Sequence, residues 1–171
     1  LQGLERLGSH PKIRLAIEVY ASAQFETSDQ AHFLALVAAL EATLEPQKVS
    51  DSVMRAIEVA TAAVKEMDNS RENDTHGTCP MDQFLSRLQS LKEASIAQKF
   101  REQIATKGGE LDPSRSRGDI EQTLKDVYNT RSRLLHDGTT EPERITSGLA
   151  FLREFVPQYL AKEFERIASV L

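Results

Sequence analysis

The sequence predicts an all-α protein, a single helical bundle of about six helices. Apolar residues recur at helical spacing almost throughout the chain, and no segment alternates apolar and polar residues between hairpin turns. Turn-forming and capping residues separate the periodic stretches. A chain of 171 residues has the length of one domain with one core, so we expect residues 1–171 to form a single domain. Because the chain begins at Leu1 and not at methionine, we expect that domain to come from a longer protein.

The N-terminal part contains three predicted helices. The first spans residues 11–24. The second follows Thr27, which forms a capping-box pattern with Gln30, and it ends before Pro46. The third spans residues 51–67. We expect these helices to pack as one bundle through three apolar stripes: Ile13, Ala16, Ile17, Tyr20 and Ala21; Phe33, Val37, Leu40 and Leu44; Val53, Ile57, Ala60 and Val64.

The middle of the chain alternates between loops and helical periodicity. Residues 68–80 are polar and rich in turn formers, which predicts a surface loop. Residues 81–106 are helical in pattern, but their apolar phase shifts between Leu91 and Ile96. Such a shift indicates either a kink or two separate helices. Residues 107–118 form a second predicted loop.

A further helix follows this loop. Asp119 and Gln122 can cap its start, and Gly138 is suited to its end because glycine tolerates the left-handed conformation. Its apolar positions are Ile120, Leu124, Val127 and Leu135.

The last predicted helix opens at a second capping-box pattern, Thr140 with Glu143, and carries Pro142 in its first turn. We expect Pro157 to kink this helix. Its stripe consists of Ile145, Leu149, Leu152, Val156, Tyr159 and Leu160.

Composition excludes several classes of protein. The formal net charge is −5, which argues against a uniformly basic nucleic-acid binder. The stretch from Lys92 to Arg133 is nevertheless slightly basic, with nine basic and seven acidic residues. No apolar run is long enough for a membrane span, and the first residues do not form a signal peptide. We therefore expect a cytoplasmic protein without a membrane partner. The single Cys79 excludes an intrachain disulfide.

Neither a metal nor a cofactor is predicted. His76 and Cys79 supply only two of the four ligands that a structural zinc ion requires. His10 and His32 are isolated, and His32 is expected to be a packing or surface residue. The sequence lacks the glycine-rich loops that bind nucleotide phosphates and the Gly-x-Ser-x-Gly nucleophile elbow.

The segment YNTRSRLLHDG, residues 128–138, is the strongest candidate for chemistry. His136 lies in the last turn of its predicted helix, where the negative end of the helix dipole favours the protonated imidazole. Arg131 and Arg133 add permanent positive charge, and a guanidinium can bind a phosphate through two parallel hydrogen bonds. A titrating imidazole with an arginine is a minimal set of groups for cleaving a phosphodiester.

Helix geometry limits how this set can act. Residues five apart are rotated by about 140°, so Arg131 and His136 do not project side by side, whereas Ser132 and His136 do. The two converge if Arg131 reaches around the helix, if the helix end unwinds, or if a second chain completes the site. The last route predicts a homodimer. The alternative is that both are surface residues compatible with the helix dipole.

These residues resemble the Arg-x(4 to 6)-His motif of the HEPN superfamily, and the wider pattern is most similar to its ApeA-like branch. The similarity rests on FLALVAALEATLEP at residues 33–46, KFREQI at residues 99–104 and YNTRSRLLHDG at residues 128–138. The resemblance implies a helical bundle, a homodimer that joins two motif helices, and a metal-independent endoribonuclease. It also implies a place in a larger prokaryotic defence or toxin protein, with a fused domain or an antitoxin as a partner.

Carried over to this chain, the resemblance assigns Arg131 to the phosphate and His136 to acid or base catalysis. Glu41, expected in the middle of its helix, would pair with Arg131 or Arg133 and hold it in place, or else be a solvent-facing or capping carboxylate. Tyr128 would stack on a base, or else serve as a core or interface aromatic. Ser132 and Asp137 depart from the pattern of active members and favour a second reading, a catalytically silent module that dimerises and binds RNA, a nucleotide or a protein. A third reading is a plain helical adaptor.

Overall fold

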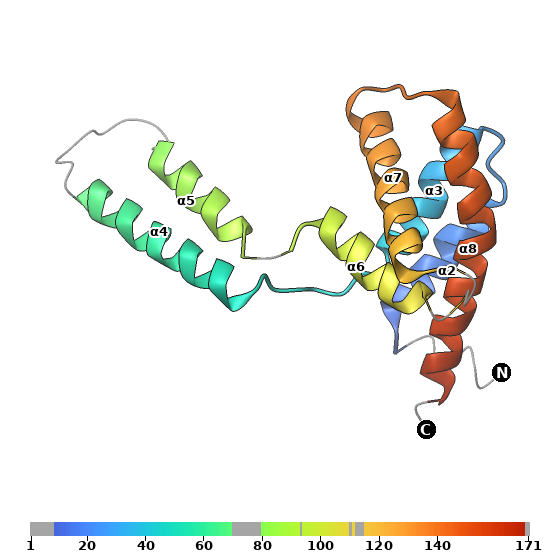
Figure 1. The fold of residues 1–171 in the computed structure, drawn as a ribbon, viewed down its shortest axis with the longest axis horizontal. Coiled ribbons are helices and arrows are strands. Elements are labelled where there is room, and N and C mark those ends of the chain that lie inside the picture. The colour runs from blue at the N-terminus through green and yellow to red at the C-terminus, as the bar shows by residue number, and fades with distance from the viewer. Residues whose placement is uncertain (1–8, 70–79, 93, 110, 112–114, 170–171) are drawn as a thin grey trace. The chain divides into compact units, whose positions relative to one another are not determined.

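The computed structural model describes residues 9–69, 80–92, 94–109, 111 and 115–169, which form seven helices and no strand (Figure 1). The predicted all-α fold class is confirmed. No helix in these residues combines the length and the apolar character needed to cross a bilayer. The helices are α2 (Pro11–Ala23), α3 (Asp29–Glu41), α4 (Asp51–Asn69), α5 (Pro80–Ser90), α6 (Ile96–Gly108), α7 (Arg117–His136) and α8 (Pro142–Ser169).

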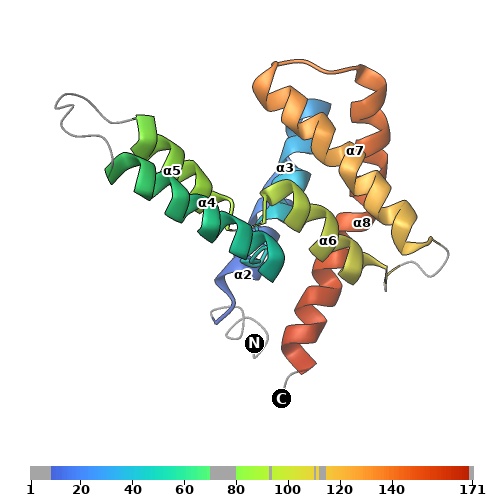
Figure 2. The same cartoon turned by 60° about the vertical axis from the view of Figure 1, so that its left-hand side comes forward.

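The chain forms two compact units where the sequence predicted one. The first unit contains α2, α3, α6, α7 and α8, and the second, Pro46–Ser95, contains α4 and α5. The predicted bundle of the first three helices is therefore wrong, because α4 packs on α5 (Figure 2). Periodicity identified the apolar face of α4, but it carries no information about which helix covers that face.

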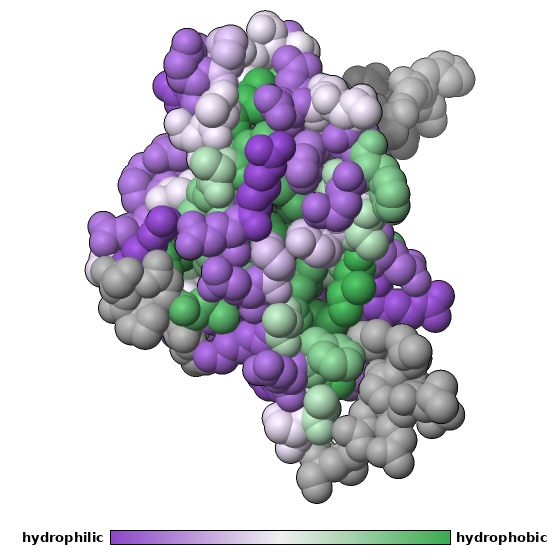
Figure 3. Space-filling model, turned by 90° about the vertical axis from the view of Figure 1, so that its right-hand side faces the viewer, coloured by the Kyte–Doolittle hydropathy of each residue, from purple (hydrophilic) through white to green (hydrophobic). Residues whose placement is uncertain are grey.

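Helix α3 is the centre of the first unit and contacts α2, α6, α7 and α8. Five of its thirteen residues are buried, and the core around them is aliphatic and aromatic. Helices α3 and α8 approach each other closely where Gly148 of α8 lies against the ring of Phe33, which is fully buried. The face in Figure 3 is mainly hydrophilic, with apolar residues visible between polar ones. The largest fully buried side chains are Tyr159, Phe33, Phe100, Leu36, Leu40, Ile104, Ile120, Leu124 and Leu152.

The second unit is a pair of helices closed at its base by backbone hydrogen bonds. The amide of Val49 donates to the carbonyl of Lys92 (3.2 Å), and the amide of Ala94 donates to the carbonyl of Gln47 (2.9 Å). The periodic stretch 81–106 is two helices, α5 and α6, as one of the two interpretations of its phase shift predicted. Of the loop predicted at residues 68–80, positions 70–79 lie outside the described residues.

Two predicted helix starts are misplaced. Ser28, not Thr27, caps α3, and its hydroxyl accepts a hydrogen bond from the amide of Ala31. Ser116, not Asp119, caps α7; Asp119 is the third helical residue and its carboxylate accepts from the Ser116 amide, which completes a capping box. Both errors have one cause: neighbouring polar residues offer similar caps, and the backbone conformation selects between them.

The start of α8 also differs from the prediction. The Thr140 hydroxyl is buried and has no hydrogen-bond partner in the described part of the chain, so it does not form a capping box. The helix begins at Pro142 and continues past Pro157 to Ser169. Gly138 has the predicted left-handed conformation, with φ of 70°.

Candidate functional site

Helix α7 positions the Arg-His motif. Its inner face is anchored in the first unit by Ile120, Leu124, Val127, Thr130 and Leu134, which are buried. The intervening residues therefore face outward or lie at the edge of the core. The helix ends at His136 and is capped by Asp137, whose amide donates to the carbonyl of Arg133 (2.8 Å). The last two turns of α7, which carry the motif, thus pack against the core on one face and are exposed on the other.

Arg131 forms an ion pair with Glu41, and it is one of the two arginines with which the resemblance would pair this carboxylate. Its Nη2 donates to Oε2 of Glu41 at 3.1 Å, and the two side chains are 24% and 19% exposed. Glu41 is the last residue of α3, not a mid-helix residue as expected. Its second oxygen, Oε1, is buried and accepts no hydrogen bond from any described residue. Because the pair is largely removed from water, it restricts the Arg131 guanidinium more than a surface ion pair would.

Tyr128 supports the same guanidinium from one helical turn earlier. The Cζ atom of Arg131 lies 5.7 Å from the centroid of the Tyr128 ring, within the range of a cation–π contact. The ring itself packs against Phe100 of α6, with centroids 5.5 Å apart. Tyr128 is therefore partly buried and packs against the core. This matches the role of core aromatic, which was expected as the alternative to stacking on a base.

The side chains of His136 and its neighbours are more exposed to solvent than that of Arg131. His136 is exposed in the last turn of α7, and no hydrogen bond or ion pair joins it to another described residue. The Arg133 side chain is exposed, and its Nη1 lies 3.8 Å from Oε1 of Glu141. Ser132 is half-buried. The exposed Leu135 adds an apolar side chain next to His136.

The structure therefore brings together three of the six predicted site residues: Arg131, Glu41 and Tyr128. It records no contact between Arg131 and His136 within the described chain, in keeping with the rotation of about 140° between residues five apart on a helix. A phosphate bound by both would have to lie across the end of α7, or the second group would have to come from another chain.

The other predicted histidines and the cysteine do not form a site. His10 is exposed before α2 without a side-chain cap, and His32 is half-buried with Nδ1 3.4 Å from Nη2 of Arg153. His76 and Cys79 lie outside the described residues. Among the residues that are described, no group of three or more His, Cys, Asp or Glu side chains could hold a metal ion.

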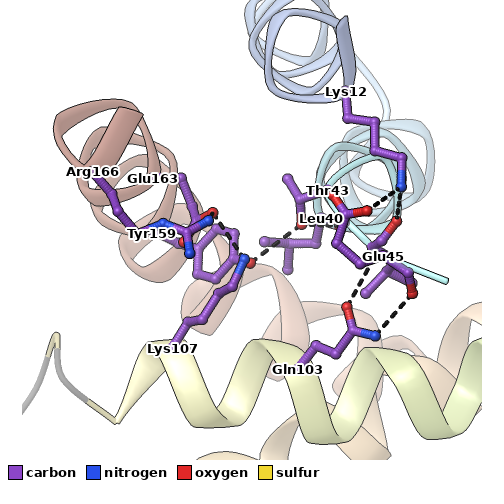
Figure 4. Close-up of polar contacts among 10 residues, drawn as sticks. Lys12, Leu40, Thr43, Glu45, Gln103, Lys107, Tyr159, Glu163 and Arg166 are labelled. Atoms are coloured by element: carbon purple, nitrogen blue, oxygen red, sulfur yellow. Dashed lines mark hydrogen bonds and ion pairs between the residues drawn. The ribbon is translucent and has the colours of Figure 1, made fainter. Parts of the chain in front are cut away.

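A second polar cluster was missed by the sequence analysis. Oε2 of Glu163 on α8 accepts hydrogen bonds from Nζ of Lys107 on α6 (2.9 Å) and from Nη2 of Arg166 (2.8 Å), and the Glu163 side chain is only 5% exposed (Figure 4). A signal was present: Glu163 lies four residues after Tyr159 and three after Leu160, on the buried stripe of α8. A carboxylate on an apolar stripe needs partners, because burial of an unpaired charge is costly.

The buried Tyr159 lies next to this cluster (Figure 4). The Thr43 hydroxyl donates to the carbonyl of Leu40 (2.7 Å), so the Tyr159 hydroxyl, 3.3 Å from Oγ1 of Thr43, is the donor in their contact. Burial raises the pKa of Tyr159 to about 12. The phenol is therefore neutral at physiological pH.

Comparisons with family models, curated proteins and solved structures gave no match.

Proposed function

We propose that this chain is a HEPN-type endoribonuclease domain that cleaves RNA without a metal ion through Arg131 and His136, in a homodimer. The observation that carries the proposal is the ion pair of Arg131 with Glu41, which joins the end of α3 to the last turns of α7. The resemblance places a glutamate near the motif arginine, and an arginine held by a partner and by an aromatic ring is preorganised to bind an anion.

The chemistry assigned to these residues is internal transesterification. The RNA 2′-hydroxyl attacks the adjacent phosphorus, the bond from phosphorus to the 5′-oxygen breaks, and a 2′,3′-cyclic phosphate and a 5′-hydroxyl result. His136 of one chain accepts the proton of the attacking hydroxyl or donates a proton to the leaving oxygen, and Arg131 neutralises the charge that develops on the phosphate. Two chains in a dimer supply both an acid and a base, which one exposed histidine does not.

One observation favours a second candidate, the catalytically silent RNA-binding and dimerisation module. The Glu41 carboxylate neutralises Arg131, and Asp137 follows His136 directly, so Arg131 has a carboxylate near it in space and His136 has one next to it in sequence. Negative charge at these positions opposes phosphate binding. In either case we propose that the domain acts on RNA in the cytoplasm, as the effector part of a defence or toxin-type protein with a fused or separate partner.

The test compares wild type, Arg131→Ala and His136→Ala on a mixed RNA substrate in excess EDTA. Each variant should lower the cleavage rate at least about a hundredfold, and the wild-type products should end in cyclic phosphate. Lys125→Ala is the matched control, since it removes an exposed cation from the same helix. Light scattering and circular dichroism establish the oligomeric state and folding of every variant.

The outcomes separate the two candidates. Cleavage that disappears in both motif variants but persists in Lys125→Ala supports the endoribonuclease. A folded dimer that binds RNA through Arg131 and does not cleave it supports the silent module. A monomer without RNA affinity contradicts both.

A further inference from the structure

A cavity of about 470 Å³ lies in the first unit, and no residue of the Arg-His motif lines it. It is formed where α2 begins and where α6 and α8 approach their C-terminal ends, next to the segment that follows α3. Its size is within the usual range of small-molecule sites, which is about 300–1,000 Å³. Pro11, Ile13 and Ile167 contribute apolar walls. The cavity thus combines space for a ligand with both apolar and charged surface.

Among the described residues that line this cavity, positive and negative charges do not balance. Lys12, Lys107 and Arg166 are cationic, whereas Glu45 and Glu163 are anionic. Nζ of Lys12 donates to Oε2 of Glu45 at 2.9 Å, which pairs these two charges. Glu163 accepts from both Lys107 and Arg166 through one oxygen, so one positive charge is left over. A chain whose net charge is −5 therefore places a local excess of positive charge inside a cavity.

Arg166 is the cation best able to contact a ligand. The Arg166 side chain is 61% exposed, although its partner Glu163 is buried. Glu163 therefore holds one nitrogen of the guanidinium, and the rest of the group is accessible to a ligand. One of its nitrogens contacts Glu163, and a guanidinium carries five N–H donors in a planar fork. This geometry suits a planar carboxylate, which accepts two parallel hydrogen bonds from arginine.

The start of α2 adds to the preference for an anion. This helix of thirteen residues has no acidic residue in its first turn and no side-chain cap on its first amides. The positive end of its dipole is therefore not neutralised locally. The neutral Tyr159 phenol, which is bonded to the cavity-lining Thr43, adds no negative charge at physiological pH.

We propose that this cavity binds a small organic acid with a single carboxylate, held by Arg166 and Lys107, and with an apolar body in contact with Ile13 and Ile167. One unbalanced positive charge matches one carboxylate; a phosphate monoester would bring close to two negative charges. The site is independent of the proposed ribonuclease activity, because it shares no residue with the Arg-His motif.

The test uses hexanoate as the probe and isothermal titration calorimetry on the full chain at low ionic strength. Hexanol, hexylamine and hexyl phosphate are matched probes that change only the head group. Hexanoate should bind more tightly than all three. Arg166→Gln should weaken hexanoate binding roughly tenfold or more, because a charge-assisted hydrogen bond is lost. Arg153→Gln is the control variant: it removes an exposed arginine of the same helix that contacts Asp29 and His32 and does not line the cavity.

Several results would overturn the proposal. These are the absence of hexanoate binding at millimolar concentration, equal affinity for hexanol, tighter binding of hexyl phosphate, and unchanged affinity in Arg166→Gln. Should Arg166→Gln fail to fold in a thermal melt, Arg166→Lys carries the same test, since lysine keeps the positive charge beside Glu163 but lacks the planar fork of donors. Hexanoate affinity that is unchanged in Arg166→Lys would then refute the assigned contact.

Discussion

Replacing Gly148 by alanine should destabilise the first unit, although alanine is the better helix former. A methyl group at this position of α8 would lie 2.7 Å from Cε2 of Phe33 and 3.4 Å from its Cδ2. Phe33 is fully buried on the central helix α3, so its ring has no open space to move into. Either the ring or the two helices must shift.

The magnitude follows from two opposing effects. Overpacking a well-packed core costs about 1–3 kcal/mol, and we take the upper part of that range because the clash is with a buried ring. Glycine to alanine inside a helix contributes about 1 kcal/mol in the other direction. The expected net loss is about 1–2 kcal/mol in the free energy of unfolding, or about 2–8 °C in melting temperature for a chain of this length.

The assay is amide hydrogen exchange in α3 and α8, which reports on the first unit separately from the second. Gly118→Ala is the matched control: a methyl group there would meet only Oγ of Ser116 at 3.7 Å, so this variant should be as stable as wild type or slightly more stable. A Gly148→Ala protein with wild-type protection would refute the reasoning. In a double-mutant cycle, Phe33→Leu should relieve part of the loss.

Three further predictions test the polar contacts. Glu41→Gln should lower the kcat for RNA about tenfold with little change in KM, as expected for a residue that positions Arg131, and Glu41→Asp should restore part of the rate; an effect on KM alone would contradict this role. Because the folded-state pKa of Tyr159 is raised to about 12, the unfolded state loses its phenolic proton first as pH rises through 10, and the free energy of unfolding should fall by about 2 kcal/mol between pH 10 and 12. Tyr159→Phe should remove that fall in urea titrations at successive pH values. Lys107→Met should cost about 2–3 kcal/mol in thermal unfolding because Glu163 keeps a single cationic partner, and the added change Glu163→Leu should recover most of the loss.

Sequence reasoning predicted the fold class because helical periodicity is a local property. The break between Leu91 and Ile96 was visible as a change of phase, and the left-handed Gly138 was visible as a glycine after a periodic stretch. The grouping of α4 with α5 was not predictable, since an apolar face does not identify the helix that covers it. The caps at Ser28 and Ser116 were missed because each has a polar neighbour of similar capping ability.

The candidate site was predictable where a family motif supplied the pairing. Glu41 and Arg131 are ninety residues apart, and their contact was expected from the resemblance, not from spacing. The cluster around Glu163 had no motif, and its partner Lys107 was assigned to a loop, whereas it lies in the last turn of α6. Glu163 is buried because of how the helices pack. The sequence alone shows it only as a charged residue on an apolar stripe.

The central position of α3 has a consequence for synthesis on the ribosome. Its apolar face is covered in large part by α8, which is translated about a hundred residues later, an interval of roughly 5–20 s at typical elongation rates. Half of that interval is taken up by translation of Pro46–Ser95, which forms a separate unit. A nascent chain paused there carries α2 and α3 with their main partner still untranslated, and it is at this stage that chaperone capture or aggregation would compete with folding.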